Sequence, residues 1–169
     1  KREPKIKKSE LEKRARNIAL AAIKFYLLKI DPNKNLLFDP EKAISFEGET
    51  GPYIQYAYAR ASSILRKAGK KVSFNKGVLR LKEKEEYLLL RELARFPEVV
   101  EISSEQLKPD IVANYAYKLA QTFTNFYSNL QVLTEEKEER KERLQLTEAT
   151  RQVLENSLKL LNITPLERM

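Results

Sequence analysis

Apolar residues recur at spacings of three and four along most of this chain, which is the period of an amphipathic helix. The series predict helices at 9–29, 53–68, 83–96, 109–130 and 144–161. The strongest series runs from Val112 to Leu130 through Tyr115, Leu119 and Phe126. The pattern therefore predicts an all-α fold, a helical bundle of four to five main helices with a helical connector at the N-terminus.

Residues that start or stop helices lie at the ends of these series. Ser9 and Glu12 have the spacing of a capping box, in which serine and glutamate satisfy backbone N–H groups that the first turn leaves unpaired. Gly69 and Pro97 supply stops, and Pro109 suits a first helical position. The predicted helices consequently have chemically defined ends.

The segments between the helices are less regular. Residues 31–52 are too apolar for a free linker and read as an ordered connection, and 98–106 as a short helix or turn. Residues 70–82 favour a basic loop over a hairpin, since an isolated two-stranded hairpin is marginal. The charged stretch 135–142 is either a solvated loop or the exposed start of the last helix. The third helix offers four residues to the core: Tyr87, Leu88, Leu90 and Leu93.

Composition narrows the function classes. The 169 residues include no cysteine and no histidine, which excludes disulfides, thiolate zinc sites and the commonest general base, and fits an intracellular protein. No run approaches eighteen apolar residues, so a membrane partner is not expected. The net charge is +8, and residues 1–82 carry the whole excess of Lys and Arg. This asymmetry favours a polyanion as partner, although charged runs are commonly solvated faces.

Two surfaces carry candidate binding chemistry. Tyr53, Tyr56, Arg60 and Lys67 share the flank of one predicted helix, beside a turn built by glycines. Aromatic rings with cations can stack on bases and neutralise phosphates, or simply cover the edge of the core. On the helix at 109–130, Tyr117, Thr124 and Tyr127 lie away from the apolar seam, with Gln121 and Asn125 available for hydrogen bonds. No nucleotide-binding glycine loop is present, and Glu47 with Glu49 makes a poor cation site.

Three stretches resemble arginyl-tRNA synthetases. FEGETGPYIQYAYARASSILRK is similar to the segment that joins their catalytic and anticodon-binding domains, usually G-[DE]-T-G-x-Y-x-Q-Y-A-x-x-R. YAYKLAQTFTNFYSNLQVL resembles their long anticodon-domain helix, and RLQLTEATRQVLENSLKLLNITPLERM their C-terminal helix and ending. The resemblance implies a connector at 1–45 and an α-helical anticodon-binding domain at 46–169.

The resemblance also implies a function for the chain. It would bind the anticodon stem-loop of tRNA(Arg), while a class I catalytic domain, absent here, would attach arginine with ATP and Mg. This chain would hold no catalytic residue, cofactor or metal. Its partners would be tRNA(Arg) and its own catalytic domain, and it would be a cytoplasmic monomer.

The residues expected to contact tRNA come from both lines of reasoning. The loop and helix start are implied by the resemblance, as are Phe126, Tyr127 and Met169 at the anticodon pocket. Lys67 and Asn125 are added for their charge and hydrogen-bonding groups. The full set is Phe46, Glu47, Gly48, Glu49, Thr50, Tyr53, Tyr56, Arg60, Lys67, Asn125, Phe126, Tyr127 and Met169. Tyr58 and Thr124 depart from the residues that the family often has at those positions, which puts polar contacts there in doubt.

Other functions fit parts of the pattern. A non-catalytic basic helical module could bind other RNA or an acidic protein. The anticodon bundle of a cysteinyl-type synthetase is disfavoured by the GETGPYIQY segment and the PLERM ending. All arginine codons have G in the middle, so every arginine anticodon has C there, and one pocket could read that base. The sequence does not assign which side chain would do so.

Overall fold

The computed structural model describes residues 6–69, 72–74 and 80–169. Within these ranges it contains α-helices and no strand, so the all-α prediction is confirmed. The helices are α1 (Lys8–Leu28), α2 (Pro40–Ala43), α3 (Gly51–Ala68), α4 (Lys84–Ala94), α5 (Phe96–Gln106), α6 (Pro109–Asn129) and α7 (Lys137–Leu160). Among the described helices, none is long and apolar enough to cross a membrane.

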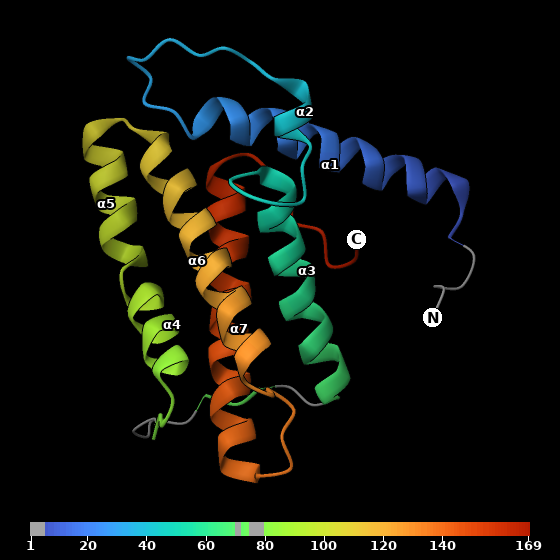
Figure 1. Ribbon diagram of the computed structural model, residues 1–169, viewed down its shortest axis with the longest axis vertical. Helices are drawn as coiled ribbons and strands as arrows, with labels where there is room; N and C mark the ends of the chain where they lie inside the picture. The colour runs from blue at the N-terminus through green and yellow to red at the C-terminus, as the bar shows by residue number, and fades with distance from the viewer. Residues whose placement is uncertain (1–5, 70–71, 75–79) are drawn as a thin grey trace.

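The helix α6 lies at the centre of the bundle. It packs against α4 and α5 on one side and against α3 and α7 on the other, as Figure 1 shows. The helix α1 lies across the end of the bundle at which α3 begins, and its N-terminal turns extend beyond α3. The expected connector is therefore a long helix that packs onto the bundle.

The core follows the apolar seam of α6. Val112, Leu119 and Phe126 are all buried there, as the helical spacing predicts. Leu154 and Leu158 of α7 are fully buried against this seam. The helix α7 begins at Lys137, so part of the charged stretch 135–142 is its exposed first turns. Of the two interpretations of that stretch, the exposed start of the last helix is therefore correct from Lys137 onward, and the solvated loop is wrong there.

The start of α1 differs from the prediction. Ser9 lies inside the helix, which is preceded by Lys7 in an extended conformation and has no side-chain cap. The capping box predicted from Ser9 and Glu12 is wrong, because the helix begins at Lys8, two residues too early for Ser9 to cap it. A capping box forms instead at α4, where the side chains of Glu83 and Glu86 exchange hydrogen bonds with each other's backbone N–H groups.

The buried face of α4 agrees with the prediction only in part, since Leu93 is buried as predicted. Tyr87 and Leu90 are exposed, whereas Leu89 is fully buried and Glu86 is nearly so. Glu86 can face the core because the guanidinium of Arg143 lies 2.8 Å from its carboxylate. The inward face therefore includes Glu86 beside Leu89 and Leu93, and a face chosen from apolar residues alone misses this glutamate.

Pro97, predicted to stop a helix, and the segment 98–106 both belong to one helix, α5. The helix α5 starts at Phe96, directly after α4, and has proline in its first turn. Proline is tolerated there because its missing N–H would be unpaired in any case. The short helix expected at 98–106 is confirmed.

The connection from α1 to α3 is ordered by contacts with α1. The Tyr26 hydroxyl donates to the carbonyl of Leu37 at 3.1 Å, and the Tyr26 ring meets Phe38 edge-on at 5.1 Å. Leu37 and Ile44 nevertheless remain exposed. For the segment 70–82, the described residues 72–74 and 80–82 contain no strand, and the remainder of the loop prediction lies outside the described residues.

Candidate nucleic-acid interface

The helix α3 is capped at both ends, by Thr50 at its start and by Gly69 at its end. Thr50 accepts a hydrogen bond from the N–H of Tyr53 at 3.2 Å and so caps the first turn. Gly69 ends the helix with a φ of +69°, a left-handed conformation that glycine adopts without steric cost. The helix therefore starts two residues before the predicted Tyr53 and ends at the predicted position.

Arg60 lies between two aromatic rings on the outer face of α3. Its guanidinium carbon is 5.5 Å from the centre of the Tyr56 ring and 5.4 Å from that of Tyr127 on α6. One of its N–H groups donates to the Tyr56 hydroxyl at 2.7 Å. This hydrogen bond raises the pKa of Arg60 and helps to orient its guanidinium. Stacked rings with a central cation form a surface on which nucleobases can pack.

Tyr127 rests on the aromatic core of α6. Its ring centre is 5.2 Å from that of Phe123, which is completely buried. Phe126 is also completely buried, so it has no surface with which to touch RNA. Its expected part in the pocket is limited to packing beneath the exposed face of the helix.

Tyr53 is on α3, about one turn before Tyr56, and its side chain packs against α6. Its ring centre is 5.6 Å from that of Tyr117, and its hydroxyl donates to Thr124 at 3.2 Å. Thr124 in turn donates to the carbonyl of Ala120 at 2.8 Å. The threonine at this position, a departure from the residues that the resemblance suggests, is thus part of an internal hydrogen-bond chain. Tyr53 is half-buried and presents only one side to solvent.

A pocket of about 230 Å³ brings three of the expected residues together: Tyr56, Arg60 and Met169. Arg66 and Arg168 also line this pocket, although they were not among the expected residues. Its walls come from α3 and from the C-terminal tail, which lies along that helix. Three arginines and one acidic residue, Glu167, line the pocket, so its lining carries a net positive charge, as a site for a phosphate backbone requires.

The tail reaches the pocket through hydrogen bonds to α3. Gln55, which is fully buried, donates to the carbonyl of Thr164 at 2.8 Å. Arg66 donates to the carbonyl of Glu167 at 3.2 Å. Arg66 is six residues beyond Arg60, about 240° further round the helix, so helical spacing does not indicate it, and it meets the pocket where it contacts the tail. Arg168 depends on the path of the tail, which periodicity does not predict.

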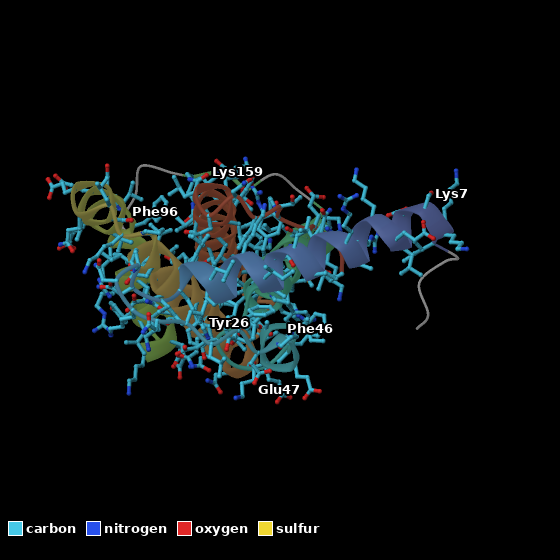
Figure 2. All side chains as sticks on the ribbon, turned by 90° about the horizontal axis from the view of Figure 1, so that it is seen from above. Lys7, Tyr26, Phe46, Glu47, Phe96 and Lys159 are labelled. Atoms are coloured by element: carbon cyan, nitrogen blue, oxygen red, sulfur yellow. The ribbon has the colours of Figure 1, made fainter. Side chains whose placement is uncertain are left out.

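The loop expected to contact tRNA lies beneath α1. Phe46 is half exposed, and Figure 2 shows Phe46 and Glu47 on the side of α1 opposite Lys159. Gly48 adopts a φ of +77° there. Thr50 is only 5% exposed, and its hydroxyl donates to the carbonyl of Ser45, so its side chain acts as a cap inside the loop.

Glu49 connects this loop to both neighbouring helices. Its carboxylate lies 3.8 Å from the ammonium of Lys29 at the end of α1, and its backbone carbonyl accepts a hydrogen bond from the same group. On the other side, burial and the nearby Glu49 charge raise the pKa of Tyr117. The loop is therefore adjacent to the Tyr53 and Tyr117 rings.

Lys67 and Asn125 are two of the expected residues that do not line the pocket. Lys67 is exposed near the end of α3, about 24 Å along the helix from Gly51 at 1.5 Å per residue. Asn125 is exposed on the side of α6 that faces α4, where it lines a small pocket with Glu92 and Lys118. The structure does not bring Asn125 together with Tyr127. Among the described residues, no acidic cluster suited to a metal ion is present.

The fold and this aromatic and cationic face define an all-helical domain of the anticodon-binding class. Residues 54–169 match the model of the DALR anticodon binding domain, and the chain belongs to that family. The sequence is 41% identical over 158 residues to the arginine–tRNA ligase of Lactococcus lactis, covering 94% of this chain and 28% of that protein. It is 42% identical over 178 residues to the arginine–tRNA ligase of Pyrococcus furiosus, covering 98% of this chain and 28% of that one.

Solved structures agree with these relatives. The Thermus thermophilus arginyl-tRNA synthetase superimposes with a TM-score of 0.86 at 38% identity, over 94% of this chain and 28% of that one. The Plasmodium falciparum arginyl-tRNA synthetase gives a TM-score of 0.85 at 31% identity over the same shares. The chain thus spans little more than a quarter of the length of the relatives that it matches.

Proposed function

We propose that this chain is the tRNA(Arg)-recognition part of an arginyl-tRNA synthetase. In this role it binds the anticodon stem-loop while a separate catalytic domain attaches arginine to the tRNA with ATP and Mg. The observation that carries the proposal is the pocket in which Tyr56, Arg60 and Met169 meet. Membership of the DALR family and the names of the relatives support the choice of tRNA over other polyanions.

The chemistry of the pocket suits an unpaired base. A base that leaves the anticodon loop stack can pack on an aromatic ring, an interaction worth about 1–3 kcal/mol. Tyr56 lines the pocket, and the Tyr127 ring contacts the guanidinium of Arg60, which supplies N–H donors. Cytosine has acceptors at N3 and O2, which are the atoms that such donors contact. We propose that the base read here is the middle C of the arginine anticodon.

The remaining predicted contacts extend along α3. The loop from Phe46 to Glu49 lies at one end of the helix and Lys67 at the other, so the two sets contact different parts of the stem-loop. We assign residues 46–169 to the binding domain and 1–45 to the connector that leads from the catalytic domain. The role in translation places the protein in the cytoplasm, and we expect a monomer because one stem-loop needs one copy of the pocket.

Binding to matched transcripts tests the proposal. Fluorescence anisotropy at several salt concentrations compares a tRNA(Arg) transcript with the same transcript carrying U at the middle anticodon position. The proposal expects salt-sensitive binding that this change abolishes or strongly weakens. Equal affinity for both transcripts, or for unrelated tRNAs, would instead indicate a basic module without anticodon specificity.

A pair of arginine substitutions separates the pocket from general charge. Arg60→Ala removes the cation between the rings, whereas Arg91→Ala removes an exposed arginine from α4. Both variants lose one positive charge, so a purely electrostatic surface predicts similar losses. The proposal expects Arg60→Ala to lose discrimination of the middle C and Arg91→Ala to retain it.

A further inference from the structure

The charged residues at the start of α7 have no part in the proposed function. Residues 135–142 hold five glutamates and three cations, a net charge of −2. The helix sorts these charges, because successive residues turn by about 100°. Three cations share an arc of about 100° and are together termed the α7 cation cluster: Lys137, Arg140 and Lys141. Three glutamates share an arc of about the same width on the opposite side: Glu138, Glu139 and Glu142.

The glutamates are engaged by the protein itself. The carboxylate of Glu139 lies 2.8 Å from the ammonium of Lys82. The carboxylate of Glu142 accepts a hydrogen bond from the backbone N–H of Arg80 at 2.7 Å. These contacts hold the segment 80–82 against α7, so this face of the helix has an internal role.

The α7 cation cluster is not balanced in this way. Its three side chains are exposed. Among the residues that the structure describes, Lys137 and Arg140 form no ion pair, and Lys141 has only Glu138, at 3.9 Å. Like charges three and four residues apart destabilise a helix, and cations are unfavourable in its first turns, where the helix dipole is positive. The cluster therefore costs α7 stability, and a bound anion would remove that cost.

The cluster lines a pocket beyond the end of α3. The pocket has a volume of about 240 Å³, and its other walls include Ala68, Val72 and Leu144. Figure 1 shows the start of α7 and the end of α3 together, at the end of the bundle opposite α1. Lys67 is seven residues beyond Arg60 on the same face of α3, about 10 Å further along the helix. Cations thus continue from the Arg60 pocket toward the cluster.

We propose that the α7 cation cluster binds phosphate groups of the anticodon loop, next to the nucleotide held at Arg60. The inference rests on the proposed function, because that function brings an RNA loop to α3. Such a loop presents a phosphate at every nucleotide, and ammonium and guanidinium groups bind phosphates without reading the base. The cluster therefore adds affinity and leaves the choice of base to the Arg60 pocket.

The salt dependence of binding tests the proposal. The probe is an anticodon stem-loop of tRNA(Arg), titrated by fluorescence anisotropy at several salt concentrations. The variant replaces all three cations of the cluster with glutamine, which removes the charge and is a good helix former. Each phosphate contact with a single strand contributes about 0.7 to the slope of log K against log salt, so the variant is expected to lower this slope by about 2. Its discrimination of the middle C is expected to be unchanged.

A matched triple variant controls for net charge. It replaces three exposed cations of α4 and α6 with glutamine: Lys84, Arg91 and Lys118. The control is expected to lower the slope by less than about 0.7, the share of one contact. Arg140→Lys retains the charge and is expected to bind as the unaltered chain does. Stability to urea gives a second readout, because removing like charges is expected to leave the cluster variant as stable as the unaltered chain or more so, whereas a structural role predicts a loss.

Neutral phosphate linkages show whether the contact is direct. Stem-loops are made with one methylphosphonate in the loop, at each linkage in turn. At one or more linkages, neutralisation is expected to weaken binding to the unaltered chain by about threefold, the scale of an exposed charge contact. The same linkages are expected to have no such effect on the cluster variant, because the partner cations are already absent.

The outcomes separate this inference from the proposed function. If the stem-loop binds and its middle C is discriminated, but the cluster variant and the control lower the slope equally, the cluster is a solvated face. The inference also fails if every neutral linkage affects the unaltered chain and the cluster variant alike. If the stem-loop does not bind, or its middle C is not discriminated, the proposed function fails and this inference fails with it.

Discussion

Replacing Gly51 by alanine tests how α1 is fixed to the bundle. A Cβ atom built at Gly51 lies 2.2 Å from the carbonyl oxygen of Ala21, 2.6 Å from its carbonyl carbon and 3.0 Å from the Cβ of Phe25. Ordinary contacts begin at 3.4 Å, so α1 would have to move by about 1.2 Å. The obstacle is helix backbone, which cannot rotate away as a flexible side chain does. The methyl group therefore forces the two helices apart.

The magnitude follows from two limits. Overpacking of a tight contact costs about 1–3 kcal/mol. The protein can instead release α1, which forfeits the burial of Phe25, about 1.5–3 kcal/mol, and of two alanine methyls, about 0.8 kcal/mol each. Alanine in place of a helical glycine returns about 0.5–1 kcal/mol. After this return is subtracted from the overpacking cost, we expect Gly51→Ala to lower the free energy of unfolding by about 0.5–2 kcal/mol.

Urea denaturation followed by circular dichroism measures this change, and Gly48→Ala supplies the comparison. Gly48 has a φ of +77° and open space around its Cβ position, so alanine there meets only the left-handed backbone penalty. Amide hydrogen exchange adds a local readout, since a displaced α1 loses protection around Phe25. If conformation alone decided, Gly51→Ala would be neutral or stabilising and only Gly48→Ala would be costly. That order of stabilities would refute the steric reasoning.

Three further substitutions test other parts of the structure. Tyr127→Ala is expected to weaken tRNA(Arg) binding by about 1–3 kcal/mol in an anisotropy titration, and an unchanged affinity would remove this ring from the site. Arg143→Met leaves Glu86 buried without its partner and is expected to lower stability to urea by about 3–5 kcal/mol at neutral pH. Burial raises the pKa of Glu86, but hydrogen bonds from Arg143 and the backbone outweigh it and lower the pKa overall. The stability from this pair is therefore present above the unfolded-state pKa and is lost as the pH falls through the folded-state pKa, and Arg143→Met is expected to lack that dependence. Finally, the ammonium of Lys108 lies 2.8 Å from Asp31 and lowers the pKa of that carboxyl to about 2, so Lys108→Ala is expected to raise it toward 3.8 in an NMR titration.

The sequence predicted those elements whose burial depends on apolar spacing alone. The seam of α6 is an example, because every inward position from Val112 to Phe126 is apolar and no ion pair intervenes. The face of α4 was missed for the opposite reason. Glu86 is buried by a partner 57 residues away on α7, and nothing local to α4 indicates that contact. Exposed Tyr87 then appeared to be the better core residue.

The candidate site shows the same division. Tyr56 and Arg60 are four residues apart on one helix, so their contact follows from helical geometry. Asn125 was grouped with Tyr127 although two residues along a helix correspond to about 200° of rotation, which places them on different faces. Arg168 lines the pocket because the tail returns to α3, and this return is a tertiary feature.

The inward face of α3 positions the residues of its outward face. Gly51 permits α1 to cross closely at one end of the helix, and buried Gln55 holds the carbonyl of Thr164 one turn further on. The first contact sets how closely α3 and α1 pack, and the second holds the C-terminal tail, which ends at Met169, against α3. Arg60 lies five residues beyond Gln55 on the same helix, and its guanidinium contacts the Tyr127 ring of α6. The segment 46–60 therefore combines packing and recognition. The buried contacts of Gly51 and Gln55 set the position of the helix that carries Arg60.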